Sequence, residues 1–504
     1  MASNANPLQV TAQVQEAFRR YYDDQFWVKN PELMSERSEL LKAEGVMYSK
    51  PVIELVKPYA ATEDASEIFK KLELPVEFGE RLAKIVFGNN FKLRKHQAEA
   101  ILTSLNHDSS QAKNVIVNTG TGSGKTECFI LPLVARFLIE ELQHGRRGLI
   151  NQWWSQNLNK NDKWNGSRIK QNQQFFGMRA LLLYPTNALV EDQITRLRSA
   201  AQRSVVNGEP LFYFGRYTGE TSGGSWQPSK NPLKADQVKE INNVAGDILE
   251  QLQMGQVSAE KNKNQFASPL AGEMMTRWDM LEAAPDILIS NTSMLNVMLM
   301  RSNEDNLFDQ TREWLNRDKK NKFTLVIDEL HAYRGTTGSE VAVTVRNFLN
   351  RIGIDTESDQ LRIIATSASI TDDSEGRGKD FVEKFFGVDS NTFKFISGNP
   401  TTNFANEKHK EQCELGNAVN EVAKQNDEAD RPQDFEEVQN LLKSKYQVDD
   451  ISNFLTKIVS SATFEPENPL PSFRIHNFLR QVEAIWCCTN PDCDQIDQRF
   501  FSFF

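Results

Sequence analysis

The chain has 504 residues, of which 39% are hydrophobic and 25% charged, so it can bury a sizeable core and should divide into more than one domain. Its 58 basic and 68 acidic residues give a net charge of -10, which excludes nucleic-acid binding through overall charge and requires any such surface to be local. No apolar run approaches the roughly 20 residues that cross a bilayer, and the first ten residues lack the pattern of a secretion signal, so we expect a cytoplasmic protein without a membrane partner.

Residues 1–90 show helical spacing of apolar residues, with prolines as punctuation. They contain no catalytic constellation. We expect a helical accessory region there.

From residue 91 to residue 395 the pattern changes to short apolar runs that each end in a polar or small-residue motif. These runs are Val115 to Val117, Leu181 to Tyr184, Ile287 to Ile289, Thr324 to Ile327 and Ile363 to Ala365. Apolar strands that alternate with helices predict an α/β domain, in which a parallel sheet is covered on both faces. Ligands of such sheets bind beyond the carboxyl ends of the strands, where these motifs stand.

Gln97 lies just upstream of the first of these strands, in the motif Leu93-Arg94-Lys95-His96-Gln97. Its carboxamide can both donate to and accept from adenine. An exposed glutamine at a helix start is the alternative.

A glycine-rich loop follows the first strand and predicts a nucleotide site. Its residues are Gly120, Thr121, Gly122, Ser123, Gly124, Lys125 and Thr126. Glycines let the backbone curl around phosphates, amide hydrogens at a helix N-terminus face the negative charge, Lys125 reaches the β and γ phosphates, and Thr126 supplies a magnesium ligand. The chain departs from the phosphate-loop pattern in having Thr119 where a glycine is usual.

An acidic pair ends a later apolar strand, in Val326-Ile327-Asp328-Glu329-Leu330-His331. Asp328 would hold the magnesium ion of a bound ATP, and Glu329 would position the attacking water. A solvated strand end is the alternative. In the next helix, Thr337 and Glu340 are spaced as a capping box, and Val341, Val345, Phe348 and Ile352 form the expected packed face.

Two segments, 142–178 and 221–282, interrupt the sheet pattern and look like insertions. The stretch 142–179 is basic and aromatic. It has Arg146, Arg147, Lys160, Lys163, Arg168, Lys170 and Arg179 against the single acid Asp162, with Trp153, Trp154 and Trp164 interleaved. Such a mixture suits single-stranded nucleic acid. The alternative, which we favour slightly, is a solvated insertion whose tryptophans pack on the domain.

Two further motifs stand at strand ends. Tyr184 to Gln193 offers hydroxyl, amide and helix N-terminal donors that suit a phosphate backbone, and an ordinary turn capped by Thr186 is the alternative. Ala365 to Ser369 offers small hydroxyl residues that can relay the state of the ATP site, although a tight turn would use the same residues.

Residues 396–480 are polar and helical and predict a linker. Residues 481–504 contain a short-spaced cysteine group in which Cys488 and Cys493 could form part of a zinc site, which needs four ligands. No second cysteine pair follows. We therefore expect a truncated or split chain in preference to a complete specialised protein.

Taken in order, these motifs resemble the first motor domain of superfamily 2 helicases of the DExH type, with Asp328 to His331 as the acidic box. Five stretches narrow the resemblance to a bacterial and archaeal group that contains large helicase-related DNA-repair helicases and the helicase of the DISARM antiphage system. They are Tyr184 to Gln193, Phe214 to Thr221, Glu273 to Trp278, Pro285 to Leu295 and Asp328 to Gly335.

The resemblance implies a RecA-like fold and assigns a role to each candidate residue. Gln97 would contact adenine, Gly120 to Thr126 and Asp328 would hold ATP and Mg²⁺, and Glu329 would activate water. His331, with Ser367, Ala368 and Ser369, would couple hydrolysis to movement. The residues that would lie along a nucleic-acid strand are Pro185, Thr186, Asn187, Thr218, Gly219, Thr292 and Ser293.

The function that follows is the N-terminal part of an ATP-dependent helicase or translocase that acts on DNA or RNA. Its implied partners are a second helicase lobe or downstream polypeptide, and a repair or defence complex. The alternatives are a DNA-binding ATPase subunit that never unwinds, and an inactive fragment of a split helicase.

Overall fold

The computed structural model describes residues 6–27, 29–42, 45–106, 111–120, 122–169, 176–224, 226–228, 232–370, 376–426, 431–461, 469–480, 486–487 and 500–501. The chain divides into two units, Ala61–Asn399 and a second one made of Met1–Ala60 with Pro400–Phe504. The first unit therefore begins well before the boundary that the sequence suggested at residue 91.

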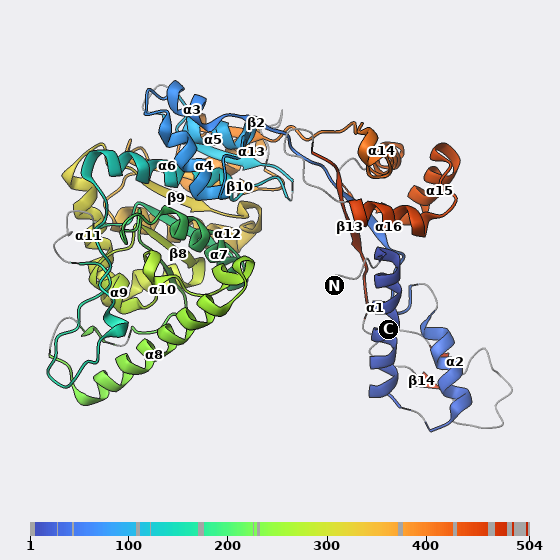
Figure 1. The fold of residues 1–504 in the computed structure, drawn as a ribbon, viewed down its shortest axis with the longest axis horizontal. Coiled ribbons are helices and arrows are strands. Elements are labelled where there is room, and N and C mark those ends of the chain that lie inside the picture. Colours follow the sequence, from blue (N-terminus) through green and yellow to red (C-terminus); the bar gives the residue numbers. More distant parts are fainter. Residues whose placement is uncertain are drawn as a thin grey trace. The chain divides into compact units, whose positions relative to one another are not determined.

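An eight-stranded sheet organises the unit Ala61–Asn399, in the order β11-β4-β10-β9-β5-β8-β6-β7. Figure 1 shows this unit, with β8, β9 and β10 labelled among the helices. Its strands are β4 (Asn114–Asn118), β5 (Ala180–Tyr184), β6 (Phe214–Tyr217), β7 (Glu273–Met274), β8 (Ile287–Asn291), β9 (Phe323–Ile327), β10 (Leu361–Ser367) and β11 (Phe393–Ser397). Every pair of neighbouring strands is parallel. All five predicted strands are present, and the predicted RecA-like α/β fold is confirmed.

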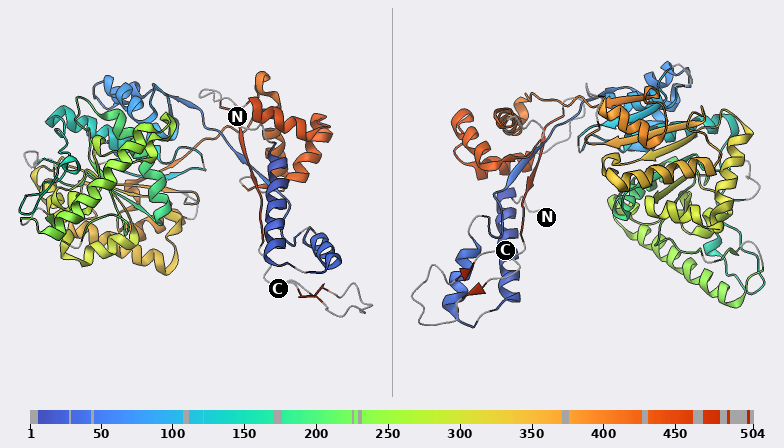
Figure 2. Two further views of the ribbon diagram at one scale, coloured as in Figure 1. Left: turned by 60° about the horizontal axis from the view of Figure 1, so that its bottom comes forward. Right: turned by 180° about the vertical axis from the view of Figure 1, so that it is seen from behind.

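Helices cover both faces of this sheet, as Figure 2 shows from two sides. One face packs against α3 (Ala65–Lys71), α4 (Glu77–Phe87), α5 (Lys95–Ser104), α6 (Glu127–His144) and α7 (Asn187–Ser204). The other packs against α9 (Arg277–Glu282), α10 (Thr292–Met300), α11 (Asp305–Arg317), α12 (Gly335–Arg351) and α13 (Arg377–Phe386). The predicted apolar face of α12 is buried, but the helix begins at Gly335, so Thr337 is not its cap.

The two insertions share one small core. Trp153, Trp154 and Trp164 of the first insertion are buried against α8 (Ala235–Val257) of the second, together with Trp278. Asp279 of α9 joins them, because its carboxylate accepts hydrogen bonds from the Trp153 ring nitrogen and from the Ser167 hydroxyl. These tryptophans are therefore packing residues, as in the alternative that the sequence slightly favoured, and they do not form a stacking surface for nucleic acid.

Three arginines of the supposed basic segment are also buried. Arg147, Arg168 and Arg179 surround the carboxylate of Asp286, at distances of 3.3, 3.1 and 3.3 Å, and Glu140 pairs with Arg147 and Arg179. These arginines hold the carboxyl pKa of Asp286 below its usual range, although burial alone would raise it. The positive charge of this segment is largely neutralised inside the protein.

The second unit combines both flanks of the chain. β1 (Val52–Val56) pairs with β13 (Ser472–His476) and with β12 (Gln433–Asp434), and α14 (Lys410–Gln425), α15 (Phe435–Tyr446) and α16 (Ile451–Ser461) share a core with Ile53 of β1. The helices α1 (Pro7–Gln25) and α2 (Pro31–Leu41) meet around Tyr22 and Leu41. The segment expected to be a helical linker is thus part of a folded unit that contains strands. Among the described residues no helix is long and apolar enough to cross a membrane.

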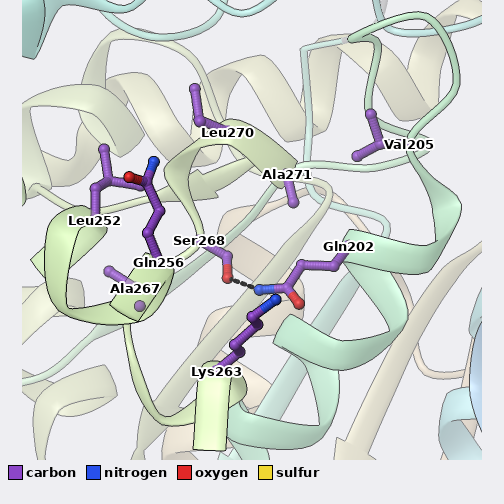
Figure 3. Close-up of a pocket in the computed structure, with 10 residues that line it drawn as sticks. Gln202, Val205, Leu252, Gln256, Lys263, Ala267, Ser268, Leu270 and Ala271 are labelled. Carbon is purple, nitrogen blue, oxygen red and sulfur yellow. Dashed lines mark hydrogen bonds between the residues drawn. The ribbon is translucent and has the colours of Figure 1, made fainter. Parts of the chain in front are cut away.

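A cavity of about 320 Å³ lies between the C-terminal ends of α7 and α8 and the short helices η4 (Glu260–Gln265) and η5 (Pro269–Ala271) (Figure 3). Leu252 and Lys263 line it, and the Gln202 carboxamide donates to the Ser268 hydroxyl across it. None of the predicted site residues lines this cavity. The cavity therefore lies between α7 and the second insertion.

Candidate ATP and nucleic-acid site

The predicted motifs meet at one edge of the sheet because the strands that carry them run parallel and in register. The ends of β4 and β10 pair through Asn118 and Ser367, and Leu183 of β5 pairs with Ile327 of β9. Tyr184 of β5 pairs with Asn291 of β8. The glycine-rich loop, the acidic pair and the three predicted nucleic-acid segments therefore follow strands that end side by side.

The glycine-rich loop adopts a conformation that requires glycine at two positions. Gly122 and Gly124 have φ angles of 76° and 79°, which L-residues rarely adopt. Thr119, the departure from the expected pattern, is buried, and its hydroxyl lies 2.6 Å from that of Ser123. Thr119 therefore closes the loop by a hydrogen bond between side chains, which a glycine could not make. Thr121 lies outside the described residues.

The motif upstream of the loop holds three successive loop carbonyls. The Arg94 guanidinium donates to the carbonyl of Gly122, the Gln97 carboxamide donates to that of Gly124, and His96 Nε2 lies 2.8 Å from that of Ser123. Gln97 Oε1 also accepts from the backbone N–H of Arg94. The carboxamide that was predicted to contact adenine thus supports the phosphate loop directly.

His96 makes a stability contribution that depends on pH. Burial lowers its pKa to about 4, from an ordinary value near 6.5, so the folded protein keeps the imidazole neutral while the unfolded chain protonates below pH 6.5. The contribution is full above pH 6.5 and is lost as the pH falls toward 4. Through this group, the unmodified protein should lose about 2 kcal/mol of its free energy of unfolding between pH 7 and pH 5. The variant His96→Gln, whose side chain cannot titrate, should not show that loss. Urea unfolding of both proteins at the two pH values measures this difference, and an equal loss in the two proteins would contradict the prediction.

The acidic box places Glu329 between Lys125 and His331. Lys125 Nζ lies 3.8 Å from one carboxylate oxygen of Glu329, and His331 Nδ1 lies 3.2 Å from the other. The same imidazole nitrogen lies 3.5 Å from the backbone N–H nitrogen of Ala368. The predicted catalytic and coupling residues are therefore brought together. Glu329 also has a φ of 52°, an unfavourable backbone conformation for a residue with a side chain, of the kind that recurs at functional sites.

Asp328 is a buried carboxylate whose partner, Thr366, belongs to the Ala365 to Ser369 motif. The Thr366 hydroxyl donates to Asp328 Oδ1 and accepts from the backbone N–H of Glu329. Burial raises the pKa of Asp328, and the Thr366 hydrogen bond opposes that shift. Thr366 precedes the predicted coupling residues by one position, and only the pairing of β10 with β9 shows its role.

The hydroxyl groups of the coupling segment have defined partners. Ser367 Oγ accepts from the backbone N–H groups of Ser369 and Ile370, and the Arg334 guanidinium donates to Ser369 Oγ. Arg334 immediately precedes α12 and follows the acidic box. The segment is therefore both a tight turn and a contact with the acidic box, so the two interpretations of it are compatible.

The predicted nucleic-acid residues differ in exposure. Thr186 is exposed at the start of α7 and makes no capping hydrogen bond, so it is not the ordinary cap that the alternative required. Pro185 and Asn187 are half-buried, and Asn187 Oδ1 accepts from Asn291 at 2.6 Å. Thr292 is half-buried, whereas Gly219 and Ser293 are exposed. Thr218 differs from expectation, because its side chain is buried and Arg277 donates to its carbonyl.

The donor set fits a magnesium-bound nucleotide. Thr126 offers a hydroxyl directly after Lys125, and Asp328 offers a buried carboxylate whose pKa is raised by burial, a cost that a divalent cation would offset. The described part of the chain contains no cluster of three or more His, Cys, Asp or Glu side chains that could hold a metal ion. Cys488 and Cys493, the predicted zinc ligands, lie outside the described residues.

Comparison with known proteins supports this interpretation. Druantia protein DruE of Escherichia coli (strain UMEA 4076-1) is 31% identical over 432 residues, which are 76% of this chain and 22% of that protein. An uncharacterized ATP-dependent helicase of Methanocaldococcus jannaschii, MJ1574, is 24% identical over 64% of this chain and 33% of its own length. The chain thus spans less than two thirds of either relative.

Among solved structures, the DUF1998 helicase MrfA bound to DNA is 19% identical, with a TM-score of 0.38 over 73% of this chain and 34% of that one. Residues 94–221, which contain the glycine-rich loop, match the family described as DEAD/DEAH box helicase. The acidic box follows on the same parallel sheet, and the chain therefore contains a superfamily 2 helicase domain of the DEAD/DEAH box type.

Proposed function

We propose that this chain is the first motor lobe of an ATP-dependent DNA helicase or translocase that works in DNA repair or antiphage defence. The observation that carries the proposal is the convergence of two kinds of motif on one edge of the sheet. The glycine-rich loop and acidic pair follow β4 and β9, while the exposed donors Thr186 and Ser293 follow the neighbouring strands β5 and β8. One edge of the sheet can then contact both ATP and nucleic acid.

The roles follow from the chemistry of each side chain. Lys125 would neutralise charge on the β and γ phosphates, and Thr126 and Asp328 would hold the magnesium ion that neutralises the rest. Glu329 would orient a water molecule for attack, and its contact with His331 connects that carboxylate to the turn that begins at Ser367. His331, Ser367, Ala368 and Ser369 are positioning residues in this scheme.

We infer that efficient turnover depends on a second RecA-like domain. Helicases of this superfamily hydrolyse ATP between two motor domains, and arginines from the second stabilise charge on the transferred phosphoryl group, by a factor of about 10³ to 10⁵ in rate. That domain, or a downstream polypeptide that contains it, is the partner we propose. If the chain works as a subunit of a repair or defence complex, a partner in that complex would supply the second RecA-like domain.

The nucleic-acid edge is tested by the variant Thr186→Ala/Asn187→Ala. We expect unmodified protein to bind a fluorescently labelled single-stranded DNA with an affinity that falls as salt rises, because phosphate contacts release counterions. Loss of the exposed hydroxyl and the carboxamide should weaken binding by about tenfold, the equivalent of 1.4 kcal/mol. Fluorescence anisotropy measures the affinity, and a parallel titration with RNA distinguishes the two substrates.

Thr62→Ala is the control, because Thr62 is an exposed threonine of β2 (Ala61–Glu63), a strand that is not part of the eight-stranded sheet. It should bind as the unmodified protein does. Equal affinity of the Thr186→Ala/Asn187→Ala protein, or no binding by the unmodified chain at low salt, would refute the assignment of this edge.

A further inference from the structure

Helix α7 connects the two ligand sites of the proposed motor. It begins at Asn187, next to the exposed Thr186, and about two and a half turns later Arg196 Nη1 donates to Glu127 Oε1 at 2.7 Å. Glu127 is the first residue of α6 and directly follows Thr126 of the phosphate loop. An ion pair therefore joins the helix that follows the nucleic-acid motif to the helix that follows the phosphate loop.

The carboxylate of Glu127 lies against the phosphate loop. Its second oxygen, Oε2, is buried and has no hydrogen-bond partner, and it lies 2.9 Å from where a Cβ atom on Gly124 would stand. A negative charge at that place opposes the binding of a triphosphate, and a guanidinium in contact with it offsets the repulsion. The position of Arg196 therefore affects how well the loop accepts phosphate.

The first two turns of α7 are tied to the other strand ends. Asn187 accepts from Asn291 at the end of β8, and Glu191 pairs with Arg216 of β6. A ligand that fixes these strand ends also fixes α7, and so the guanidinium of Arg196. The same position of α7 then suits both ligands, which is the condition for positive coupling between two sites.

We propose that the Glu127–Arg196 pair is a positioning pair through which nucleic acid at the N-terminal end of α7 promotes ATP binding at the phosphate loop. This inference rests on the proposed function. Neither residue touches the reacting atoms in this scheme. If the pair served only to hold two helices together, its loss would lower stability a little and leave the coupling between the two sites unchanged.

The test measures coupling directly, with a fluorescent non-hydrolysable ATP analogue and a single-stranded thymidine oligonucleotide. In the unmodified protein a saturating amount of oligonucleotide should tighten analogue binding by about fivefold or more. Arg196→Gln should abolish this effect and weaken analogue binding without DNA, because the charge of Glu127 is no longer offset. Adding Glu127→Gln should restore that affinity but not the coupling, and Arg196→Lys, which keeps the charge, should retain both.

Arg312→Gln is the matched control, since Arg312 is also paired in a helix and its side chain is 45% exposed, against 46% for Arg196. It should keep the coupling. The proposal is overturned if Arg196→Gln keeps it too, if Glu127→Gln restores no affinity, or if the unmodified protein binds DNA without any coupling. Direct titration of labelled oligonucleotide in the absence of nucleotide tests the proposed function separately, and thermal unfolding confirms that each variant is folded.

Discussion

Replacement of Lys125 by alanine is expected to weaken ATP binding by about 100-fold, the equivalent of roughly 3 kcal/mol. The Lys125 side chain is only 12% exposed and stands beside Glu329, where a charged contact with phosphate is screened little by solvent. The variant also removes the ammonium group that lies 3.8 Å from the Glu329 carboxylate. Binding of a fluorescent ATP analogue with magnesium measures the loss.

Thermal unfolding provides a second measurement of the Lys125→Ala variant. A ligand that binds only the folded state raises its stability, so the analogue should raise the Tm of the unmodified protein and leave that of the variant unchanged. Lys384→Ala is the control, because Lys384 forms an exposed pair with Asp380 within α13. An unmodified protein that shows no shift at all would favour an inactive fragment or a non-catalytic binding module.

Asp286→Ala is expected to lower the free energy of unfolding by about 3 to 5 kcal/mol, because it leaves buried arginines without their central counter-charge. Arg147, Arg168 and Arg179 all contact this carboxylate, and the backbone N–H of Tyr213 donates to it as well. Glu140 would still pair with Arg147 and Arg179, but Arg168 would lose the carboxylate that it contacts. Urea denaturation followed by tryptophan fluorescence would measure the change.

The matched control for Asp286 is Asp309→Ala. Asp309 also accepts from arginines, Arg312 and Arg351, but its side chain is 39% exposed, so solvent replaces what is lost. We expect a change below about 1 kcal/mol there. A similar small change for Asp286 would mean that water enters the buried cluster and solvates the arginines.

The convergence of the candidate ATP-site residues was predictable because these residues are contiguous or follow uninterrupted apolar strands. Gly120 to Thr126 belong to one loop, and Asp328 ends the completely buried strand β9. Parallel pairing of the strands then places these residues side by side, so no other contact has to be known to predict their proximity. Thr366 was noted only within the Ala365 to Ser369 motif, because its hydrogen bond to Asp328 depends on the pairing of β10 with β9.

The sequence left two interpretations of the basic insertion open for a physical reason. Local composition showed arginines and tryptophans with the single acid Asp162, whereas Asp286 stands 139 residues from Arg147 and Asp279 stands 126 residues from Trp153. Charge balance of this kind forms only in the folded state. The expected boundary at residue 91 failed similarly, because α3 and α4 carry ordinary amphipathic patterns that do not reveal which core they join.

The pairing of β1 with β13 has a consequence for synthesis on the ribosome. Ile53 pairs with Ile475, while the whole Ala61–Asn399 unit lies between them in the chain. Because a chain emerges from its N-terminus, the helicase domain can complete its sheet while β1 is still without its partner strand. The unit formed by the two flanks can therefore complete its folding only after the ribosome has translated the entire Ala61–Asn399 unit.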